Sequence, residues 1–530
     1  MTVALARYFD KAILAGSSVL QGFDPAAFTK TLESHVIGIA WDGPAAESQE
    51  GRTALALIVE LLARLYPVLA FAQDDGETSA FAASLIARAR AINERLDLAE
   101  PAAAMVWVCV GQGAAPANDA LALHVGSDGW IARFSSRGPV PVGSSPNPFG
   151  AAAAACLGAA NVFRYVFGDQ LVAGDLDGDV QISVLTLDPL EAEPTNPTLP
   201  PVDFGEAFLV GAGAIGSATV WTLTRVPALA GTLHVVDGEK LDLSNVQRYV
   251  GSSEAEIGTV KVELAARALA NTGLRVEPAA MRWGEFLKRR GDWGLESVLV
   301  ALDSAEDRIL VQGALPRWIA NAWTQPGDIG VSRHDFDDER ACLACLYTPK
   351  AVQPHLRDKV AEDLKLTTVE AKARVSNLLY NGDAVGEEFL REVATAMNMD
   401  VQPLLPFADK PLIEFYHVAV CGGLILSLGG GSDASRAEVP LAFQSAMAGV
   451  LLAAELVAHA GGLRSVPLAV TTKINLLRPL GSVLCLPHGK APGCICGDED
   501  YLAAYRTKYE HVHGSGDASL RATREGPALL

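Results

Sequence analysis

The chain has 530 residues, half of them hydrophobic, which is enough for about two to four domains with buried cores. Its formal net charge of −20 argues against nucleic-acid binding by bulk electrostatics, although an acidic balance alone identifies no partner. Its eight cysteines are scattered and do not form a disulfide scaffold, which favours a reducing, cytoplasmic location.

Residues 1–195 are predicted to form an α/β domain, because apolar runs of strand length alternate with segments of helical apolar spacing. Strand candidates span residues 35–40, 68–71 and 105–110, and helix candidates span residues 52–65, 79–96 and an alanine-rich stretch that ends near Phe167. The preceding sequence MTVALARYFDKAIL lacks the basic, apolar and small-residue layout of a signal peptide.

A glycine-rich loop follows a proline-rich linker, TNPTLPP, at residues 195–201. A short apolar run leads into the loop GAGAIG, whose glycines are Gly211, Gly213 and Gly216. A helical stretch and a second apolar run come next, and the second run ends in Asp237. This order is typical of dinucleotide-binding folds, where glycines and a helix N-terminus approach a phosphate. Alone, it favours an NAD(P)- or FAD-dependent oxidoreductase.

The residues after Asp237 change this interpretation. The segment DLSNVQR contains Asn245 and Arg248, and the later turn GTVK ends in Lys261. Two long cations near a phosphate-binding loop suit a triphosphate better than a pyrophosphate that the loop already holds. With these motifs, over roughly residues 205–350 and again over 439–461, the sequence resembles the ThiF/MoeB adenylyltransferase superfamily, which includes the ubiquitin-activating enzymes.

The resemblance implies a role for each matched residue. The loop glycines and Asp237 are expected to bind the nucleotide, with the carboxylate on the ribose. Asn245, Arg248 and Lys261 are expected to hold the phosphates. Asp303, which ends the apolar run VLVALD, is expected to help bind Mg²⁺.

Two places depart from the family pattern. The family usually has GAGGLG in the loop, and this chain has Ala214, whose methyl group we expect to be tolerated if the residue keeps a negative φ. The segment RYFDK begins at Arg7, where the family has RYxRQ and sends a cation from the partner fold to the triphosphate. Asp10 replaces the arginine there, so we do not assign that role to this segment.

The order of strand and helix candidates in the first half weakly resembles that in the second half. The first half lacks the glycine loop, the acid after the second strand and the SNxQR segment, so it would be an inactive copy. Ubiquitin-activating enzymes pair one active and one inactive adenylation fold in this way, but an ordinary α/β domain shows the same alternation. The predicted fold class is α/β: a Rossmann-like ThiF/MoeB adenylation fold that begins with residues 202–347, is preceded by a degenerate, inactive adenylation-like domain, and carries a helical insertion.

The helical insertion and crossover segment is expected over residues 348–438. Residues 351–366, 369–380 and 386–397 have the apolar spacing of short packed helices. The sequence does not choose between a partner-docking role and a structural cap for this segment.

The adenylation domain is expected to end over residues 439–509. Its apolar stretch 441–460 contains Gln444 and Glu455, so we interpret it as a buried core helix rather than a membrane span. Residues 510–530 have few bulky apolar side chains and are expected to be disordered.

Two cysteine pairs are candidate zinc ligands. Cys342 and Cys345 form a CxxC pair, and Cys494 and Cys496 form a CxC pair near the C-terminus. Four thiolates suit tetrahedral zinc, and many members of the resembled family carry such a structural site. The second pair is a tighter and less common chelate than CxxC, which argues against binding of one ion by both of its sulfurs. A redox CxxC is the competing interpretation.

Cys421 is the candidate nucleophile for a thioester. It lies in HVAVCGG, before an apolar run and three consecutive glycines, and small neighbours allow another chain to approach its sulfur. Activating enzymes place their cysteine in this crossover region. The alternative is that Cys421 is a small buried hydrophobe.

Together these features predict an ATP-dependent activating enzyme that adenylates the C-terminal carboxylate of a ubiquitin-like protein and passes it to its own cysteine. This most resembles the enzymes of bacterial ubiquitin-like conjugation systems. Expected partners are a ubiquitin-like protein that ends in glycine and a conjugating enzyme. No nucleic acid or membrane is expected as a partner, and the sequence does not decide whether the protein forms a homodimer. The alternatives are a sulfur-carrier adenylyltransferase without a thioester step, an oxidoreductase and a silent scaffold.

Overall fold

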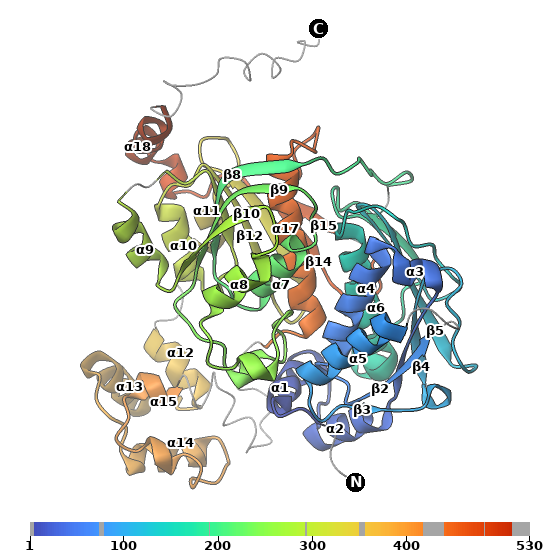
Figure 1. Cartoon of the computed structure of the whole chain (residues 1–530). Coiled ribbons are helices and arrows are strands. Elements are labelled where there is room, and N and C mark those ends of the chain that lie inside the picture. Colours follow the sequence, from blue (N-terminus) through green and yellow to red (C-terminus); the bar gives the residue numbers. More distant parts are fainter. Residues whose placement is uncertain are drawn as a thin grey trace. The chain divides into compact units, whose positions relative to one another are not determined.

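The computed structural model is shown in Figure 1 and describes residues 5–73, 79–189, 191–291, 294–348, 356–416, 439–481 and 483–510. Residue contacts divide the chain into two compact units. Unit 1 comprises Met1–Phe9, Gln21–Thr348 and Pro440–Leu530, and unit 2 comprises Asp10–Leu20 and Pro349–Val439. Each unit buries its own hydrophobic core.

The first half of unit 1 is built on a seven-stranded sheet with the strand order β3-β2-β1-β4-β5-β6-β7. Its strands are β1 (Ile37–Trp41), β2 (Val68–Gln73), β3 (Asp97–Leu98), β4 (Val106–Val110), β5 (Leu121–Asp128), β6 (Ile131–Ser135) and β7 (Asp179–Ser183). Its helices are α2 (Pro25–Ser34), α3 (Gly43–Glu47), α4 (Gln49–Leu62), α5 (Ser79–Ile92) and α6 (Phe149–Phe167). Strands β1 and β4 are buried along their whole length, as expected for central parallel strands.

The second half of unit 1 is built on an eight-stranded sheet with the order β10-β9-β8-β11-β12-β13-β14-β15. Its strands are β8 (Val202–Val210), β9 (Leu229–Val236), β10 (Leu274–Ala279), β11 (Ser297–Val300), β12 (Trp318–Thr324), β13 (Ile329–Asp335), β14 (Thr471–Ile474) and β15 (Leu484–Leu486). Its helices are α7 (Ala214–Leu223), α8 (Lys261–Leu269), α9 (Trp283–Arg290), α10 (Ala305–Gly313), α11 (Leu343–Tyr347), α17 (Ala442–Ala460) and α18 (Glu499–Glu510).

The two sheets share one strand order when β1 is matched to β8. In both, the first five strands in the chain pair in parallel and the sixth runs antiparallel to the fifth. A long apolar helix precedes the seventh strand in each half, α6 in the first and α17 in the second. The second half adds α9 and α10 and carries unit 2 as an insertion between β13 and α17. The predicted fold class is therefore confirmed.

The two halves meet where α6 and α17 pack against each other, seen in Figure 1 as the teal and orange helices. The rings of Phe163 and Phe443 lie 5.9 Å apart at this contact. Helix α17 also packs closely on α7, since a Cβ at Gly449 would stand 2.5 Å from that of Ala218. The halves therefore share a core.

Two helices of the described chain, residues 149–170 and α17, are long and apolar enough to cross a membrane by length and composition alone. Both are mostly buried inside the protein, a property shared by core helices of soluble proteins. The prediction of a core helix over residues 441–460 is confirmed.

Unit 2 contains the helices α12 (Leu356–Asp363), α13 (Val369–Asn381), α14 (Glu387–Ala396) and α15 (Leu412–Tyr416), and α1 (Phe9–Val19) lies largely in it. Their apolar faces enclose a core whose largest buried members are Phe389, Phe415 and Tyr416. The three helices predicted here are confirmed over the described residues, and residues 351–355 of the first prediction lie outside them. The contribution of α1 was missed, because no local signal ties it to a segment more than 300 residues away.

Candidate functional site

The glycine loop lies between β8 and α7 and needs its glycines for steric reasons. Gly211 has φ +96°, and a Cβ there would stand 2.5 Å from the Ala301 carbonyl oxygen. A Cβ at Gly216 would stand 2.1 Å from the Gly211 carbonyl oxygen, because α7 starts directly against the strand end. Ala214 is not among the residues with positive φ, so its methyl group is accommodated as predicted. The loop is a tight turn from strand to helix.

The amino end of α7 is open to a ligand. The N-cap residue is Gly213, which has no side chain that could cap the first amide groups of the helix. The first amide N–H groups of a helix have no partner within the helix, and they carry a partial positive charge. This end of α7 therefore has the chemistry of an anion-binding site.

Asp237 follows β9 and fastens the loop to the neighbouring strand. Its Oδ2 accepts a hydrogen bond from the Ala212 amide at 2.8 Å, and its Oδ1 accepts one from the Glu239 amide at 2.8 Å. Each oxygen has a second lone pair for a hydroxyl donor. The carboxylate is thus held where it can also accept from a bound ligand.

Gly211, Asp237 and Asp303 belong to one edge of the sheet. Gly211 follows β8, Asp237 follows β9, and Asp303 lies just beyond β11. Strands β9 and β11 flank β8, and each pairs with it in parallel. The chain leaves β8 in one direction for β9 and returns on the other side for β11. Such a switch point is where open α/β sheets bind ligands.

Arg248 supplies a cation that has no carboxylate partner among the described residues. Its guanidinium donates to the Ser244 carbonyl oxygen at 3.2 Å and lies 5.6 Å from the centre of the Tyr249 ring. Burial lowers the pKa of Arg248, and Tyr249 and Asp303 act against this effect. A partly buried arginine without a counter-ion suits an anionic ligand.

Lys261 is the second cation and begins α8. Its ammonium group donates to the Glu239 carboxylate and, at 3.2 Å, to the Tyr249 hydroxyl. Burial alone would lower the pKa of Lys261, but Tyr249, Glu239 and Asp237 raise it above its usual value. Lys261 is therefore protonated.

Asn245 is held in a short turn ahead of Arg248. Its Oδ1 accepts a hydrogen bond from the Asp242 amide at 3.1 Å, while the Asp242 carboxylate caps the following turn at Ser244. This reciprocal capping fixes the start of the segment. The Asn245 amide nitrogen has no hydrogen-bond partner among the described residues and is able to donate to a ligand.

The first half carries an acid at the place of the glycine loop. Asp42 directly follows β1 and accepts hydrogen bonds from the amides of Ala45, at 2.8 Å, and Gly113, at 2.7 Å. Gly111 has φ +103°, and a Cβ there would stand 2.3 Å from the Asp42 carboxylate. A fixed carboxylate among these amides would repel a phosphate. The turn after β1 therefore disfavours a phosphate at the place where the second half has its glycine loop.

The four candidate zinc ligands come together. Sulfur-to-sulfur distances are 3.8 Å from Cys342 to Cys345, 3.6 Å from Cys342 to Cys494 and 3.4 Å from Cys345 to Cys496, and all four sulfurs lie within 4.8 Å of one another. Hydrogen bonds from Cys342 and Cys494 lower the pKa of Cys345, and the Ala491 amide adds to this effect. The CxC spacing therefore does not prevent the gathering of four sulfurs around one point.

Cys421, the predicted nucleophile, lies outside the described residues, as do residues 511–530 of the tail predicted at 510–530. Glu510 is the last residue of α18. Cys109 and Cys156 are buried, and burial raises their thiol pKa, that of Cys109 to about 12. Both therefore behave as core residues, as predicted. Cys485 lies on β15 and is exposed.

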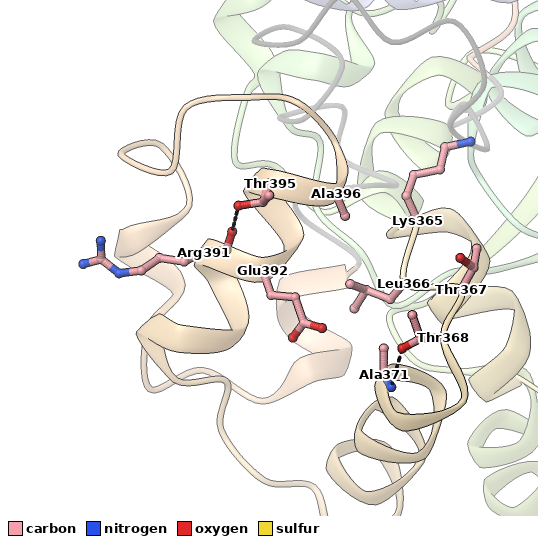
Figure 2. A pocket seen from close by; sticks show the side chains of 9 residues that line it. All are labelled: Lys365, Leu366, Thr367, Thr368, Ala371, Arg391, Glu392, Thr395 and Ala396. Carbon is pink, nitrogen blue, oxygen red and sulfur yellow. Dashed lines mark hydrogen bonds between the residues drawn. The ribbon is translucent and has the colours of Figure 1, made fainter.

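Unit 2 contains a shallow pocket of about 380 Å³ beside α13 and α14 (Figure 2). It is lined by Lys365, Leu366, Thr367, Thr368, Ala371, Arg391, Glu392, Thr395 and Ala396. The hydroxyls of Thr368 and Thr395 are engaged with the backbone of their own helices, and Arg374 pairs with Glu392 at 2.9 Å. The pocket therefore presents no nucleophile or base aimed at a common point.

Two contributions to the site were missed from the sequence. Tyr249 joins Arg248 to Lys261, and its place directly after Arg248 in the motif was the available signal. Glu60, Arg64 and Arg88 of the first half contact the backbone of residues 246–252. Their spacing resembles a solvated helix face and gave no signal.

Comparison with known families now places the chain. Residues 203–494, more than half of it, match the sequence profile of the ThiF family.

The chain belongs to the ThiF family.

ThiF/MoeB membership supports ATP-dependent adenylyltransferase activity. Residues 40–168 also match the profile of prokaryotic E2 family C, the part of the chain whose strand order repeats that of the ThiF sheet. The match to this second family supports the resemblance to bacterial ubiquitin-like systems.

One relative covers almost the whole chain. Protein y4jF of Sinorhizobium fredii (strain NBRC 101917 / NGR234), which carries the name "uncharacterized protein", is 47% identical over 509 residues, or 96% of this chain and 98% of that protein. Among solved structures, E. coli MccB with AMPCPP and selenomethionine MccA is 16% identical with a TM-score of 0.33, and E. coli MccB alone is 14% identical with a TM-score of 0.34. The matches cover 55% of this chain and 66% and 64% of those chains, which is less than two thirds.

Proposed function

We propose that this ThiF-family protein activates the C-terminal carboxylate of a ubiquitin-like protein with Mg-ATP. The observation that supports this most is Arg248, a partly buried cation without a carboxylate partner in the described chain, which adjoins the glycine loop through Tyr249. Asp237 would hold the ribose, Asn245, Arg248 and Lys261 the phosphates, and Asp303 a Mg²⁺ ion.

The donor set fits ATP. A triphosphate brings about four negative charges, and the site offers the amino end of α7 and two cations within one segment of chain. Lys261 pairs with Glu239, whose side chain is 76% exposed, so phosphate can replace that partner at little cost. Mg²⁺ would neutralise charge on the phosphate oxygens.

The proposed reaction is an adenylyl transfer. A carboxylate oxygen of the carrier attacks the α-phosphorus of ATP, the bond to the bridging oxygen breaks, and pyrophosphate leaves with the electron pair. Arg248 and Lys261 hold the phosphates in line and stabilise the charge that develops on the leaving group. No protein proton is needed, because the attacking carboxylate is already ionised.

A thioester step would follow at Cys421. Its thiolate would attack the carbonyl carbon of the acyl adenylate, AMP would leave, and the acyl group would pass to a conjugating enzyme. The match of residues 40–168 to an E2 family supports conjugation over the sulfur-carrier alternative, which stops at the adenylate. The oxidoreductase alternative gives Arg248 and Lys261 no joint role.

The remaining assignments complete the proposal. Cys342, Cys345, Cys494 and Cys496 would bind one structural zinc ion, which their mutual distances allow. Residues 1–195 would be an inactive adenylation-like domain, residues 202–347 and 439–509 the active one, and residues 348–438 the insertion with the crossover segment. The protein would act in the cytoplasm without nucleic acid or membrane, and the paired halves would take the place of two subunits, leaving homodimerisation open.

Pyrophosphate exchange tests this function. The purified protein should exchange labelled pyrophosphate into ATP only when a small carrier protein ending in glycine, encoded beside it, is present. The same carrier without its terminal glycine is the control and should support no exchange. Exchange that is independent of the carrier, or none with any neighbouring small protein while NAD binds, would reject the proposal.

A further inference from the structure

A charged cluster in the first half forms hydrogen bonds with the backbone of residues 246–252, the segment that includes Arg248. The cluster consists of Glu60 on α4, Arg64 directly after α4, and Arg88 on α5. Glu60 pairs with Arg64 at 2.7 Å and with Arg88 at 2.6 Å. The side chain of Arg64 has no solvent exposure and that of Glu60 is 5% exposed.

The two arginines donate hydrogen bonds to carbonyl oxygens of residues 246–252. Arg64 Nη1 donates to Val246 and its Nη2 donates to Ser252 at 2.9 Å. Arg88 Nη2 also donates to Ser252, at 3.2 Å. In the other direction, the Gly251 amide donates to Glu60 Oε2 at 3.1 Å. One guanidinium thus spans two carbonyls six residues apart.

These contacts matter because the segment has no regular secondary structure of its own. It contains turns between a short 3₁₀ helix at Leu243–Asn245 and another at Glu254–Glu256. Val246 lies between Asn245 and Arg248, so the hydrogen bond from Arg64 holds the backbone that carries both side chains. A loop gains a defined conformation only from contacts that offset its conformational entropy.

The cluster keeps its ion pairs at neutral pH, because Glu60 stays ionised. Burial alone would raise the pKa of Glu60, but Arg88 and Arg64 together lower it, so the carboxylate is ionised at neutral pH. The cluster therefore keeps one negative and two positive charges, and the remaining positive charge faces carbonyl oxygens.

We propose that Glu60, Arg64 and Arg88 are positioning residues for the nucleotide site, which set the affinity for the triphosphate by fixing the backbone that carries Asn245 and Arg248. This inference rests on the proposed adenylation function and gives the first half a role in it. The cluster acts through the backbone of residues 246–252.

The Arg64→Lys variant tests the proposal. It keeps the charge beside Glu60, but a single ammonium group cannot span the Val246 and Ser252 carbonyls. The matched control is Arg164→Lys, because Arg164 is equally buried on α6, pairs with Asp177, and makes no contact with residues 246–252. Calorimetry should show a Kd for Mg-ATP raised about tenfold in Arg64→Lys, as for the loss of one charge-assisted contact, and unchanged in Arg164→Lys.

Two further readouts separate positioning from general destabilisation. The Kd for AMP should rise less than that for ATP, because AMP lacks the two outer phosphates. Amide hydrogen exchange in the ligand-free protein should accelerate over residues 246–252 in Arg64→Lys and not in Arg164→Lys. If Arg64→Lys does not fold, Arg88→Gln, which removes one Ser252 contact from a partly exposed position, replaces it with the same expectations.

The outcomes are distinct. Unchanged ATP affinity in a folded Arg64→Lys protein overturns the inference alone, whether or not exchange accelerates. An equal rise in Kd for ATP and AMP in both lysine variants also overturns it. A wild-type protein that binds no ATP overturns the proposed function and this inference together.

Discussion

Lys261 donates a hydrogen bond to the Tyr249 hydroxyl over 3.2 Å and so joins the start of α8 to the segment that carries Arg248. A Cβ at Gly213 would stand 3.4 Å from the same hydroxyl, so Tyr249 also borders the glycine loop. The two cations and the loop therefore form one site around a single tyrosine.

This arrangement predicts that Arg248→Ala and Lys261→Ala each weaken binding of Mg-ATP. Losing one charge-assisted phosphate contact should cost about 1.5–3 kcal/mol, or roughly ten- to a hundredfold in Kd. Calorimetry with Mg-ATP and with NAD measures both nucleotides. Binding of NAD in the micromolar range, with none for ATP, would contradict the assignment.

The glycine loop predicts opposite effects at two neighbouring positions. Gly216→Ala would put a methyl group 2.1 Å from the Gly211 carbonyl oxygen, so the loop must shift, at a cost of about 1–3 kcal/mol, and ATP binding should be lost. Ala214→Gly is the control, since it places the family's usual glycine at that position and should keep ATP binding. A Gly216→Ala protein that binds ATP normally would show that the loop does not approach the phosphates.

The sequence could predict the strands, loop and helix of the candidate nucleotide site because they lie in one stretch with regular spacing. The loop, Asp237 and Arg248 follow each other within about forty residues, and local periodicity placed the strands and helix around them correctly. The four cysteines were also predictable, since their chemistry requires proximity whatever the intervening fold.

Contacts between distant segments could not be predicted in this way. Glu60 and Arg64 stand four residues apart at the end of α4, a spacing common in exposed ion pairs, and nothing local shows that both are buried against residues 246–252. The same holds for Asp42, whose carboxylate occupies the place of the glycine loop only because β4 brings Gly113 beside it. Such facts arise from topology rather than from local pattern.

The cysteine cluster predicts about one zinc ion per chain. Cys342→Ser and Cys494→Ser should each lose the ion and lower the melting temperature, while Mg-ATP affinity stays unchanged because neither sulfur belongs to the nucleotide site. Cys485→Ser is the matched control at an exposed position. Elemental analysis of protein purified without chelators measures the content, and protein without zinc would leave the four residues as ordinary thiols.

A buried ion triad predicts how stability depends on pH. Glu455 pairs with Arg333 and with Arg464, both at 2.6 Å. Burial alone would raise the pKa of Glu455, but the two arginines lower it from 4.5 to about 2. Because the folded-state value is the lower one, the triad's contribution is complete above about pH 4.5 and is lost as the pH falls towards 2.

The Glu455→Gln variant measures this contribution. Each pKa unit corresponds to about 1.36 kcal/mol, so the wild type should lose on the order of 2 kcal/mol of unfolding free energy as the pH falls from about 4.5 to 3. Urea unfolding between pH 7 and pH 3 should show a shallower decline for Glu455→Gln, which is also less stable at pH 7. Glu296→Gln, which breaks an exposed pair with Arg317, should follow the wild type. Parallel declines in Glu455→Gln and the wild type would assign the acid sensitivity to other groups.

The last prediction concerns the thioester. Adenylate formation needs only the nucleotide site, whereas transfer needs a thiolate that can reach the activated carbonyl carbon. Cys421→Ala should therefore still exchange pyrophosphate with the carrier protein but form no adduct that a reducing agent cleaves on a gel. Cys485→Ser, at the exposed cysteine of β15, should form the adduct normally. Adduct formation by Cys421→Ala would place the nucleophile elsewhere. A wild type that exchanges pyrophosphate without any adduct would stop at the adenylate, as the sulfur-carrier alternative requires, and Cys421 would then have no part in the reaction.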